Sequence, residues 1–291
     1  GSNLYVTMEP CTHFGLTPPC TNIIIKKKIN KVFFSFNDVD QRTFNKSKQV
    51  LLKKKIKVYK KKNKNFKNFY LSYFINKNFK LPLIDAKIAL SKDYYSINKN
   101  NKWITNIFSR TRAHLIRSEY DSIISTSTSI NKDNSLLNCR LNGFDSNKPN
   151  LIIIDLNLRI KTNLNFYKLS NKRKTFIITS SNNRQKISEL KQRGIKFIII
   201  NSLSNKKDFI EIFSALKRKG FNRILVETGL KFLNELLKNK LVYNLYLFKS
   251  STKLGKNGFN KSSINFIKKL KLNNKIKVNL NGDHLYKLRI K

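Results

Sequence analysis

The chain has 291 residues, with 60 lysines and arginines against 16 aspartates and glutamates, and a formal net charge of +44. Hydrophobic residues make up 40% of it, and 21 phenylalanines and 11 tyrosines can fill a sizeable core, which excludes a disordered basic tail. Three cysteines are too few for a disulfide scaffold, and the length allows about two domains.

The first 62 residues alternate short strand and helix patterns. Strands are expected at residues 4–7, 32–36 and 56–59, and helices at 18–28 and 46–55. The first of these helices opens on Pro18-Pro19, and Pro is favoured in the first turn of a helix. Residues 63–80 are rich in Lys and Asn, with aromatic residues at helical spacing, and predict a connecting helix.

Beyond residue 81, short apolar runs alternate with helical segments. Runs such as Leu151–Ile154 and Phe197–Ile200 have the length of buried strands, and this alternation predicts an α/β domain with a mostly parallel central sheet. The Asn- and Lys-rich stretches predict surface loops at residues 98–102, 164–174 and 255–263. No apolar run approaches about 18 residues and no signal peptide is visible, so we expect a cytoplasmic protein without a membrane span.

A cysteine motif stands in the loop after the first strand. Residues 9–20 read EPCTHFGLTPPC, with Cys11 following a Pro and Cys20 opening the next helix. In zinc deaminases of bases and nucleosides, two thiolates and a histidine hold Zn²⁺, and the glutamate of an H-x-E motif moves protons. The whole string resembles the deaminase half of the bifunctional riboflavin-biosynthesis deaminase/reductases, and the resemblance implies Cys11 and Cys20 as zinc ligands.

The rest of the deaminase motif is missing from this sequence. None of the three histidines, His13, His114 and His284, is followed two residues later by a glutamate. A catalytic zinc needs three protein ligands and a neighbouring acid/base. The zinc site is therefore expected to be incomplete, and deaminase activity is expected only of a complete parent protein.

The resemblance to the same family continues through the second half of the chain. It is carried by KIALSKD at residues 87–93, WIT at 103–105, DNSLLNCR at 133–140 and VETG at 226–229. It implies a dihydrofolate-reductase-like α/β domain that follows an incomplete cytidine-deaminase-like domain. We therefore expect a truncated deaminase domain at 1–62, a connector at 63–80 and an NADPH-dependent reductase domain at 81–291.

The resemblance also implies a reaction and a set of site residues. The family's reductase passes a hydride from NADPH to a phosphoribosylaminopyrimidine, and the sugar opens to a ribitylamino chain. The implied catalytic residues are Lys87 and Glu227. The implied cofactor contacts are Ala89, Trp103, Thr105, Ser129, Asp133, Gly229, Leu230, Lys231, Phe232, Leu233, Asn234 and Glu235. The implied substrate contacts are Asn101, Arg117, Leu137, Arg140 and Glu227.

The positive charge supports a competing hypothesis of another class. It is spread over the sequence, with triple-lysine clusters at 26–28, 53–55 and 60–62. Lys, Asn, Ile and Phe all have A/T-rich codons, so compositional drift enriches them together, and the charge alone predicts only nonspecific, salt-sensitive binding to nucleic acid. The alternative is a decayed, non-catalytic basic protein that binds RNA or a partner. The resemblance instead implies a homodimer formed through the reductase domain.

Overall fold

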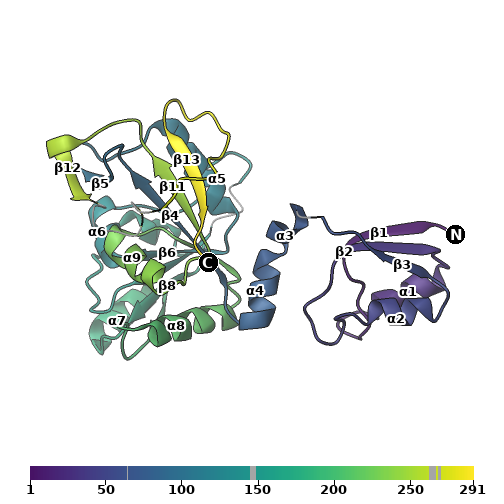
Figure 1. Ribbon diagram of the computed structural model, residues 1–291. Coiled ribbons are helices and arrows are strands. Elements are labelled where there is room, and N and C mark those ends of the chain that lie inside the picture. The colour runs from purple at the N-terminus through teal and green to yellow at the C-terminus, as the bar shows by residue number, and fades with distance from the viewer. Residues whose placement is uncertain (64, 145–148, 262–266, 268–269) are drawn as a thin grey trace. The chain divides into compact units, whose positions relative to one another are not determined.

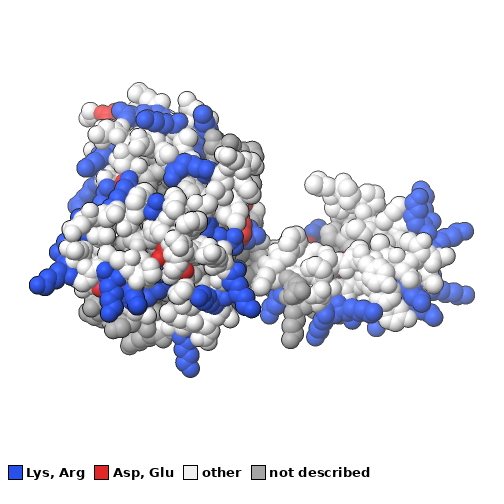
Figure 2. Space-filling view, turned by 90° about the horizontal axis from the view of Figure 1, so that it is seen from above, with Lys and Arg blue, Asp and Glu red and all other residues white. Residues whose placement is uncertain are grey.

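A computed structural model describes the chain except for residues 64, 145–148, 262–266 and 268–269 (Figure 1). The chain divides into two units, Gly1–Leu81 (unit 1) and Pro82–Lys291 (unit 2). Lys and Arg are scattered over the face shown in Figure 2 and do not gather in one patch. Among the described residues, no helix has the length and apolar character needed to cross a membrane.

Unit 1 is built around a parallel three-stranded sheet in the order β1-β2-β3. Its elements are β1 (Asn3–Met8), α1 (Cys20–Lys26), β2 (Lys31–Phe36), α2 (Ser47–Leu52), β3 (Lys57–Lys60), α3 (Asn65–Phe69) and α4 (Leu71–Phe79). The alternation predicted for residues 1–62 is confirmed, and α1 begins directly after Pro19, its N-cap residue. Ile24, Val32, Leu51 and Ile56 form the core between the helices and the sheet.

The predicted connector contains the two helices α3 and α4 of unit 1. Phe36 of β2 contacts Tyr70 and Phe74, with ring centroids 6.4 and 6.2 Å apart. Phe69, by contrast, is 72% exposed. Only some of the regularly spaced aromatic rings in this segment therefore pack against the sheet.

Unit 2 contains an eight-stranded sheet in the order β13-β11-β4-β10-β6-β7-β8-β9. All neighbours are parallel except β11 and β13. The strands of the sheet are β4 (Leu83–Leu90), β6 (Ser122–Thr126), β7 (Asn150–Ile154), β8 (Thr175–Thr179), β9 (Ile195–Ile199), β10 (Arg223–Val226), β11 (Asn244–Lys249) and β13 (His284–Arg289). A separate antiparallel pair is made by β5 (Tyr95–Asn98) and β12 (Gly258–Lys261). The predicted α/β class with a mostly parallel sheet is confirmed.

Most helices of unit 2 begin at a side-chain cap. The helices are α5 (Ile107–Ser118), α6 (Ser127–Asp133), α7 (Arg184–Gln192), α8 (Lys206–Arg218) and α9 (Leu230–Lys238), with 3₁₀ turns η1 (Asn165–Leu169) and η2 (Gly255–Asn257). The side chains of Asn106, Thr126, Asn183 and Asn205 accept backbone N–H groups at the starts of α5 to α8. In α9 the N-cap is Gly229, which has no side chain to accept those N–H groups.

The expected surface loop at residues 164–174 is wrong in its middle and at its end. Phe166 of η1 is fully buried in the main core of unit 2. Arg173 is 6% exposed. Many residues around Phe166 are polar, so the composition of the segment predicted an exposed loop. Burial differs from residue to residue within a segment, and composition does not show it.

The path of the chain through the large sheet reverses beside β4. From β4 the chain continues to β6 and outward through β7, β8 and β9. Strand β10 then returns to lie between β4 and β6, and β11 pairs with the other side of β4. Ligands of open α/β sheets bind at the carboxyl ends of the strands where the order reverses. The site is therefore expected at the carboxyl ends of β4, β10 and β6.

Candidate active site

A buried glutamate lies at this reversal. Glu227 directly follows the last residue of β10, and it is 8% exposed. Its N–H donates to the Ile124 carbonyl at 2.9 Å, and the Ser125 hydroxyl donates to its carbonyl at 2.8 Å. Strand β6 thus fixes the backbone on which the carboxylate is mounted. Because an unpaired buried charge is costly, this carboxylate needs cations around it.

Two cations from distant parts of the chain surround Glu227. Arg117, in the last turn of α5, donates from Nε to Oε1 at 2.6 Å and from Nη2 to Oε2 at 2.9 Å. Lys87, on β4, places Nζ 3.5 Å from Oε2. The Lys87 and Arg117 side chains are 18% and 12% exposed. Strand β4, helix α5 and the end of β10 thus bring one carboxylate and two cationic side chains together in a cluster that is largely shielded from solvent.

The cluster shifts the pKa values of its members. Burial alone raises the pKa of Glu227, but Arg117 and Lys87 together lower it to about 2. Burial lowers the pKa of Lys87, against the attraction of Glu227. Glu227 is therefore charged at neutral pH, and Lys87 gives up its proton more readily than an ordinary lysine. A lysine of this kind is suited to proton transfer.

A second set of polar groups continues from Arg117 to the surface. Nη1 of Arg117 donates to the Asn138 carbonyl at 3.2 Å, and Nδ1 of His114 is 2.9 Å from the same oxygen. Nη2 of Arg140 is 3.3 Å from Nε2 of His114, and Nη1 of Arg140 donates to Oδ1 of Asn138 at 2.9 Å. A continuous hydrogen-bonded path therefore links buried Glu227 to exposed Arg140.

We expect acid to destabilise unit 2 through His114 between about pH 6.5 and pH 4. Burial, followed by repulsion from Arg117 and Arg140, lowers the pKa of His114 from 6.5 to about 4. The unfolded chain therefore binds the proton first, and stability present above about pH 6.5 is lost as pH falls through 4. The difference between the two pKa values corresponds to about 3 kcal/mol of stability, which solvent screening of this half-buried ring reduces to about 1–2 kcal/mol.

The measurement is urea unfolding at pH 7, 5.5 and 4.5, followed by the fluorescence of Trp103, the single tryptophan. His114→Gln removes the titrating group and should show a flatter pH dependence than the unsubstituted chain. Glu227 loses its own contribution only below about pH 4.5, so it does not mask this window. Equal pH dependence in the two proteins would contradict the assignment.

The loop that carries Asn138 and Arg140 is fixed by a buried arginine. Leu137 has a φ of 48°, a left-handed conformation that costs an L-residue about 1–2 kcal/mol. Arg173 donates from Nη1 to the Leu137 carbonyl at 2.7 Å and from Nη2 to the Leu136 carbonyl. Burial, and then the charge of Arg117, lowers the pKa of Arg173 to about 10. Arg173 thus holds the strained loop in place by hydrogen bonds to the carbonyl groups of the loop.

Two helix N-termini meet at the same edge of the sheet. A Cβ on Gly229, the first residue before α9, would lie 3.9 Å from the Ser129 hydroxyl in the first turn of α6. The start of α9 has no side-chain cap, and N–H groups at a helix start bind anions. These N–H groups and the Ser129 hydroxyl form a donor set that fits the phosphates of a dinucleotide such as NADPH.

Comparison with known proteins identifies this arrangement. The RibD C-terminal domain family matches residues 84–278. The chain belongs to this family. The riboflavin biosynthesis protein RibD of Buchnera aphidicola is 30% identical over 271 residues, which are 88% of this chain and 71% of that protein. The RibD of Actinobacillus pleuropneumoniae is 25% identical over 254 residues, which are 85% of this chain and 66% of that protein.

Solved structures of RibD proteins show the same fold. The chain is 22% identical to a diaminohydroxyphosphoribosylaminopyrimidine deaminase/5-amino-6-(5-phosphoribosylamino)uracil reductase from Thermotoga maritima. The TM-score is 0.80, with 99% of this chain and 79% of that chain covered. The expected dihydrofolate-reductase-like fold and the riboflavin-biosynthesis reductase family are therefore confirmed. The chain spans about two thirds of the length of its curated RibD relatives.

Most of the predicted substrate contacts lie around the cluster. Glu227 and Arg117 are in direct contact, and Arg140 joins them through His114 and the Asn138 carbonyl. Leu137 is buried in the loop held by Arg173, so its side chain supports that loop. Asn101 lies outside the cluster, where its side chain accepts the Trp103 N–H at 3.0 Å. The substrate roles of these residues in a RibD reductase domain remain predictions.

The predicted cofactor contacts that precede α9 in the sequence lie on several different elements. Trp103 is 48% exposed, and Arg110 stacks over its ring with 4.6 Å between guanidinium carbon and ring centroid. The Thr105 carbonyl accepts Nη1 of the same arginine at 2.8 Å. Asp133 ends α6, and burial raises its pKa against the charges of two lysines. Ala89 is partly buried in β4 and packs against the main core.

The predicted cofactor contacts on α9 separate by face. Leu230 and Leu233 are each 1% exposed, so only their backbone atoms can reach a ligand. Phe232 packs edge-on against Phe209, and Glu235 pairs with Lys238 at 3.0 Å. Lys231 is exposed. The Oδ1 atom of Asn234 is buried and finds no hydrogen-bond partner among the described residues.

Sequence reasoning missed three residues of the site: His114, Asn138 and Arg173. His114 precedes Arg117 by three residues on one helix, and residues at that spacing share a helix face. That spacing was a usable signal. Asn138 lies two residues before Arg140, inside the segment that already carried the resemblance. No sequence signal marks Arg173, because its partners are backbone carbonyls of a loop about 36 residues away.

The two cysteines of unit 1 lie close together but lack a third metal ligand among the described residues. The Cys20 N–H donates to Sγ of Cys11 at 3.1 Å. Nδ1 of His13 lies 3.0 Å from the Thr43 hydroxyl. Among the described residues, no three His, Cys, Asp or Glu side chains are grouped to hold a metal ion. The expected zinc is thus not supported, because two thiols lack a third ligand.

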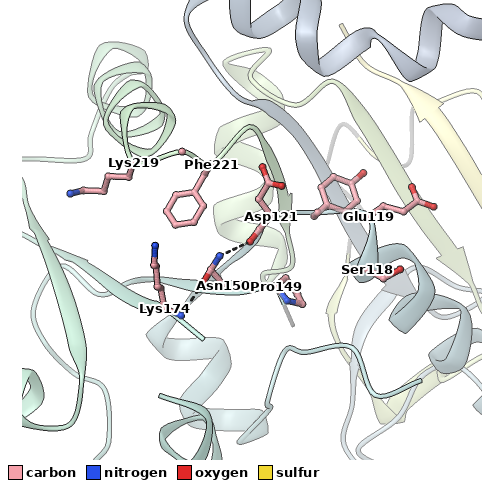
Figure 3. Close-up of a pocket in the computed structure, with 10 residues that line it drawn as sticks. Ser118, Glu119, Asp121, Pro149, Asn150, Lys174, Lys219 and Phe221 are labelled. Atoms are coloured by element: carbon pink, nitrogen blue, oxygen red, sulfur yellow. Dashed lines mark hydrogen bonds between the residues drawn. The ribbon is translucent and has the colours of Figure 1, made fainter. Parts of the chain in front are cut away.

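A cavity of about 500 Å³ lies at the opposite edge of the large sheet (Figure 3). Its lining residues lie before β6, β8 and β10 and around the start of β7, and they include Asp121, Asn150, Lys174 and Phe221. The Asp121 carbonyl accepts Nδ2 of Asn150 at 3.0 Å, as the dashed line in Figure 3 marks. This cavity opens at the amino ends of the strands and therefore does not belong to the Glu227 cluster.

Proposed function

We propose that unit 2 catalyses the NADPH-dependent reduction of 5-amino-6-(5-phosphoribosylamino)uracil to its ribitylamino product. The observation that carries the proposal is the buried Lys87–Glu227–Arg117 cluster at the carboxyl edge of the sheet, connected to exposed Arg140. The uncapped start of α9 lies beside it. The name printed for the Thermotoga maritima protein includes the same reduction, which supports this choice of substrate.

The cofactor side is formed by helix starts and the Trp103 loop. NADPH, when bound, supplies the hydride. The N–H groups at the start of α9 and the Ser129 hydroxyl bind its phosphates, because both are donors at the positive end of a helix. Trp103 is half exposed and braced by Arg110, and it offers a flat ring surface to a ligand.

The substrate side has one group for each part of the sugar phosphate. Arg140 pairs with the phosphate, since a guanidinium fork matches its oxygens. Glu227 accepts a hydroxyl hydrogen of the sugar at Oε1, which keeps a lone pair beyond the one used by Arg117, whereas Oε2 already faces both Arg117 and Lys87. As C1′ gains hydride, its bond to the ring oxygen breaks, and Nζ of Lys87 donates a proton to that oxygen. The lowered pKa of Lys87 favours this transfer.

Purified chain mixed with NADPH and the substrate should lose absorbance at 340 nm. Arg140→Ala should raise KM at least about tenfold, since hydrogen bonds to charged groups contribute about 1.5–3 kcal/mol. Arg218→Ala, an exposed position on α8, is the matched control and should be neutral. NADPH at a hundred times its Kd should raise Tm by roughly 5–10 °C. A folded chain that binds NADPH but oxidises none with this substrate contradicts the proposal.

We further propose that deamination requires a complete parent protein. In unit 1, Cys11 and Cys20 contact each other and lack a third ligand among the described residues. A deaminase also needs an acid/base residue beside its zinc-bound water. The chain as given is therefore expected to act on the substrate only after its amino group has been replaced.

A further inference from the structure

The two arginines of the site differ in how many of their donors are already used. Nε and Nη2 of Arg117 are bound to Glu227, and its Nη1 donates to the Asn138 carbonyl. The fork of Arg117 is thus occupied within the protein. In the described part of the chain no carboxylate pairs with Arg140, whose residue surface is exposed. An incoming anion therefore meets Arg140.

The guanidinium of Arg140 is held at two points. Its Nη1 donates to Oδ1 of Asn138 at 2.9 Å, and its Nη2 lies 3.3 Å from Nε2 of His114. These contacts leave Nε and one hydrogen on each terminal nitrogen for a ligand. Burial, and then repulsion from Arg117, lowers the pKa of Arg140, so an anion bound there relieves a local excess of positive charge.

The protonation state of His114 follows from its partners. The Asn138 carbonyl can only accept, so Nδ1 of His114 carries the hydrogen that it donates at 2.9 Å. In the neutral ring Nε2 then has a lone pair and accepts from Arg140. Burial and the two neighbouring arginines keep the ring neutral near pH 7. His114 is therefore an acceptor for Arg140.

We propose that His114 is a positioning residue that aims Arg140 at the phosphate of the substrate and so sets the preference for phosphorylated over dephosphorylated substrate. This inference rests on the proposed function and adds a residue to it. The Asn138 carbonyl that accepts from His114 also accepts Nη1 of Arg117 at 3.2 Å, so this oxygen ties the ring to the Glu227 cluster.

Two amide variants separate the two hydrogen bonds of the ring. His114→Asn places an amide near the Nδ1 position and can still donate to the Asn138 carbonyl, but it does not reach Arg140. His114→Gln places its amide near the Nε2 position and can still accept from Arg140. We expect His114→Asn to raise KM for the phosphorylated substrate about tenfold, with unchanged kcat and NADPH affinity. We expect His114→Gln to stay within about threefold of the unsubstituted chain.

The dephosphorylated substrate provides the second arm of the experiment. Its KM should be nearly equal in all three proteins, because the phosphate contact is absent. A similar loss with both substrates, or rescue by Asn and not by Gln, would show that His114 only supports the loop, and would overturn the inference. Unchanged KM in both variants would overturn it as well. Melting curves of the variants verify that each is folded.

Calorimetric titration of the full chain with ribose 5-phosphate separates this inference from the proposed function. If the unsubstituted chain oxidises no NADPH, the proposed function fails. Tighter binding of ribose 5-phosphate to the unsubstituted chain and His114→Gln than to His114→Asn still supports the role of His114. Equal binding by all three proteins, or no binding by any of them, overturns that role.

Discussion

Replacing Arg117 by Met is expected to lower the free energy of unfolding of unit 2 by about 3–5 kcal/mol, the cost of removing one partner from a buried ion pair. The Arg117 and Glu227 side chains are only 12% and 8% exposed, and the pair is bidentate. Lys87, 3.5 Å from the carboxylate, cannot replace two short bonds. For a unit of this size the expected fall in Tm is roughly 6–20 °C.

The matched control is Arg218→Met, which removes an exposed arginine from α8 and should change Tm little. Trp103 lies in unit 2, so its fluorescence reports that unit alone. The double variant Arg117→Met, Glu227→Met should lose less than the sum of the single variants, because neither charge is left without the other. A loss below about 1 kcal/mol in Arg117→Met would show that the pair is hydrated and weakly coupled.

The sequence predicted the elements of the sheet that are buried on both faces. Runs such as Leu151–Ile154 are continuous and apolar because helices and neighbouring strands cover them completely. It also predicted the edge strand β9 from the apolar run at its end, although Ile199 is 55% exposed. It did not predict the other edge strand, β13 (His284–Arg289), nor the antiparallel pair β5–β12, where charged or polar residues interrupt the apolar pattern.

For the site, motif resemblance identified positions but not partners. Glu227 and Arg117 are 110 residues apart, and only the return of β10 between β4 and β6 brings them together. The predicted contacts on α9 were named without regard to the face of the helix on which each side chain lies. Leu230 and Leu233 stand at core spacing on that helix, and the structure buries both side chains. Helical periodicity could have separated them from the residues that face a ligand.

Replacing Glu227 by Gln is expected to lower the rate of NADPH oxidation at least about 100-fold, the lower end of what a positioned proton-transfer group contributes. The substitution keeps the volume of the side chain and one acceptor, so a change in rate reports the lost charge. Glu227 raises the pKa of Lys87 against the effect of burial. Without that charge, a larger share of Lys87 is neutral at pH 7 and cannot donate its proton to the sugar oxygen.

The pH dependence of the rate tests this reasoning directly. In Glu227→Gln the residual rate should rise toward acidic pH, because protonation restores the donor at Lys87, and the NADPH-induced rise in Tm should be retained. Glu211→Gln, an exposed carboxylate on α8, is the matched control. A rate within threefold of the unsubstituted chain would exclude Glu227 from the chemistry. A 100-fold loss with an unchanged pH profile would leave Glu227 as a substrate contact and assign the proton to a group other than Lys87.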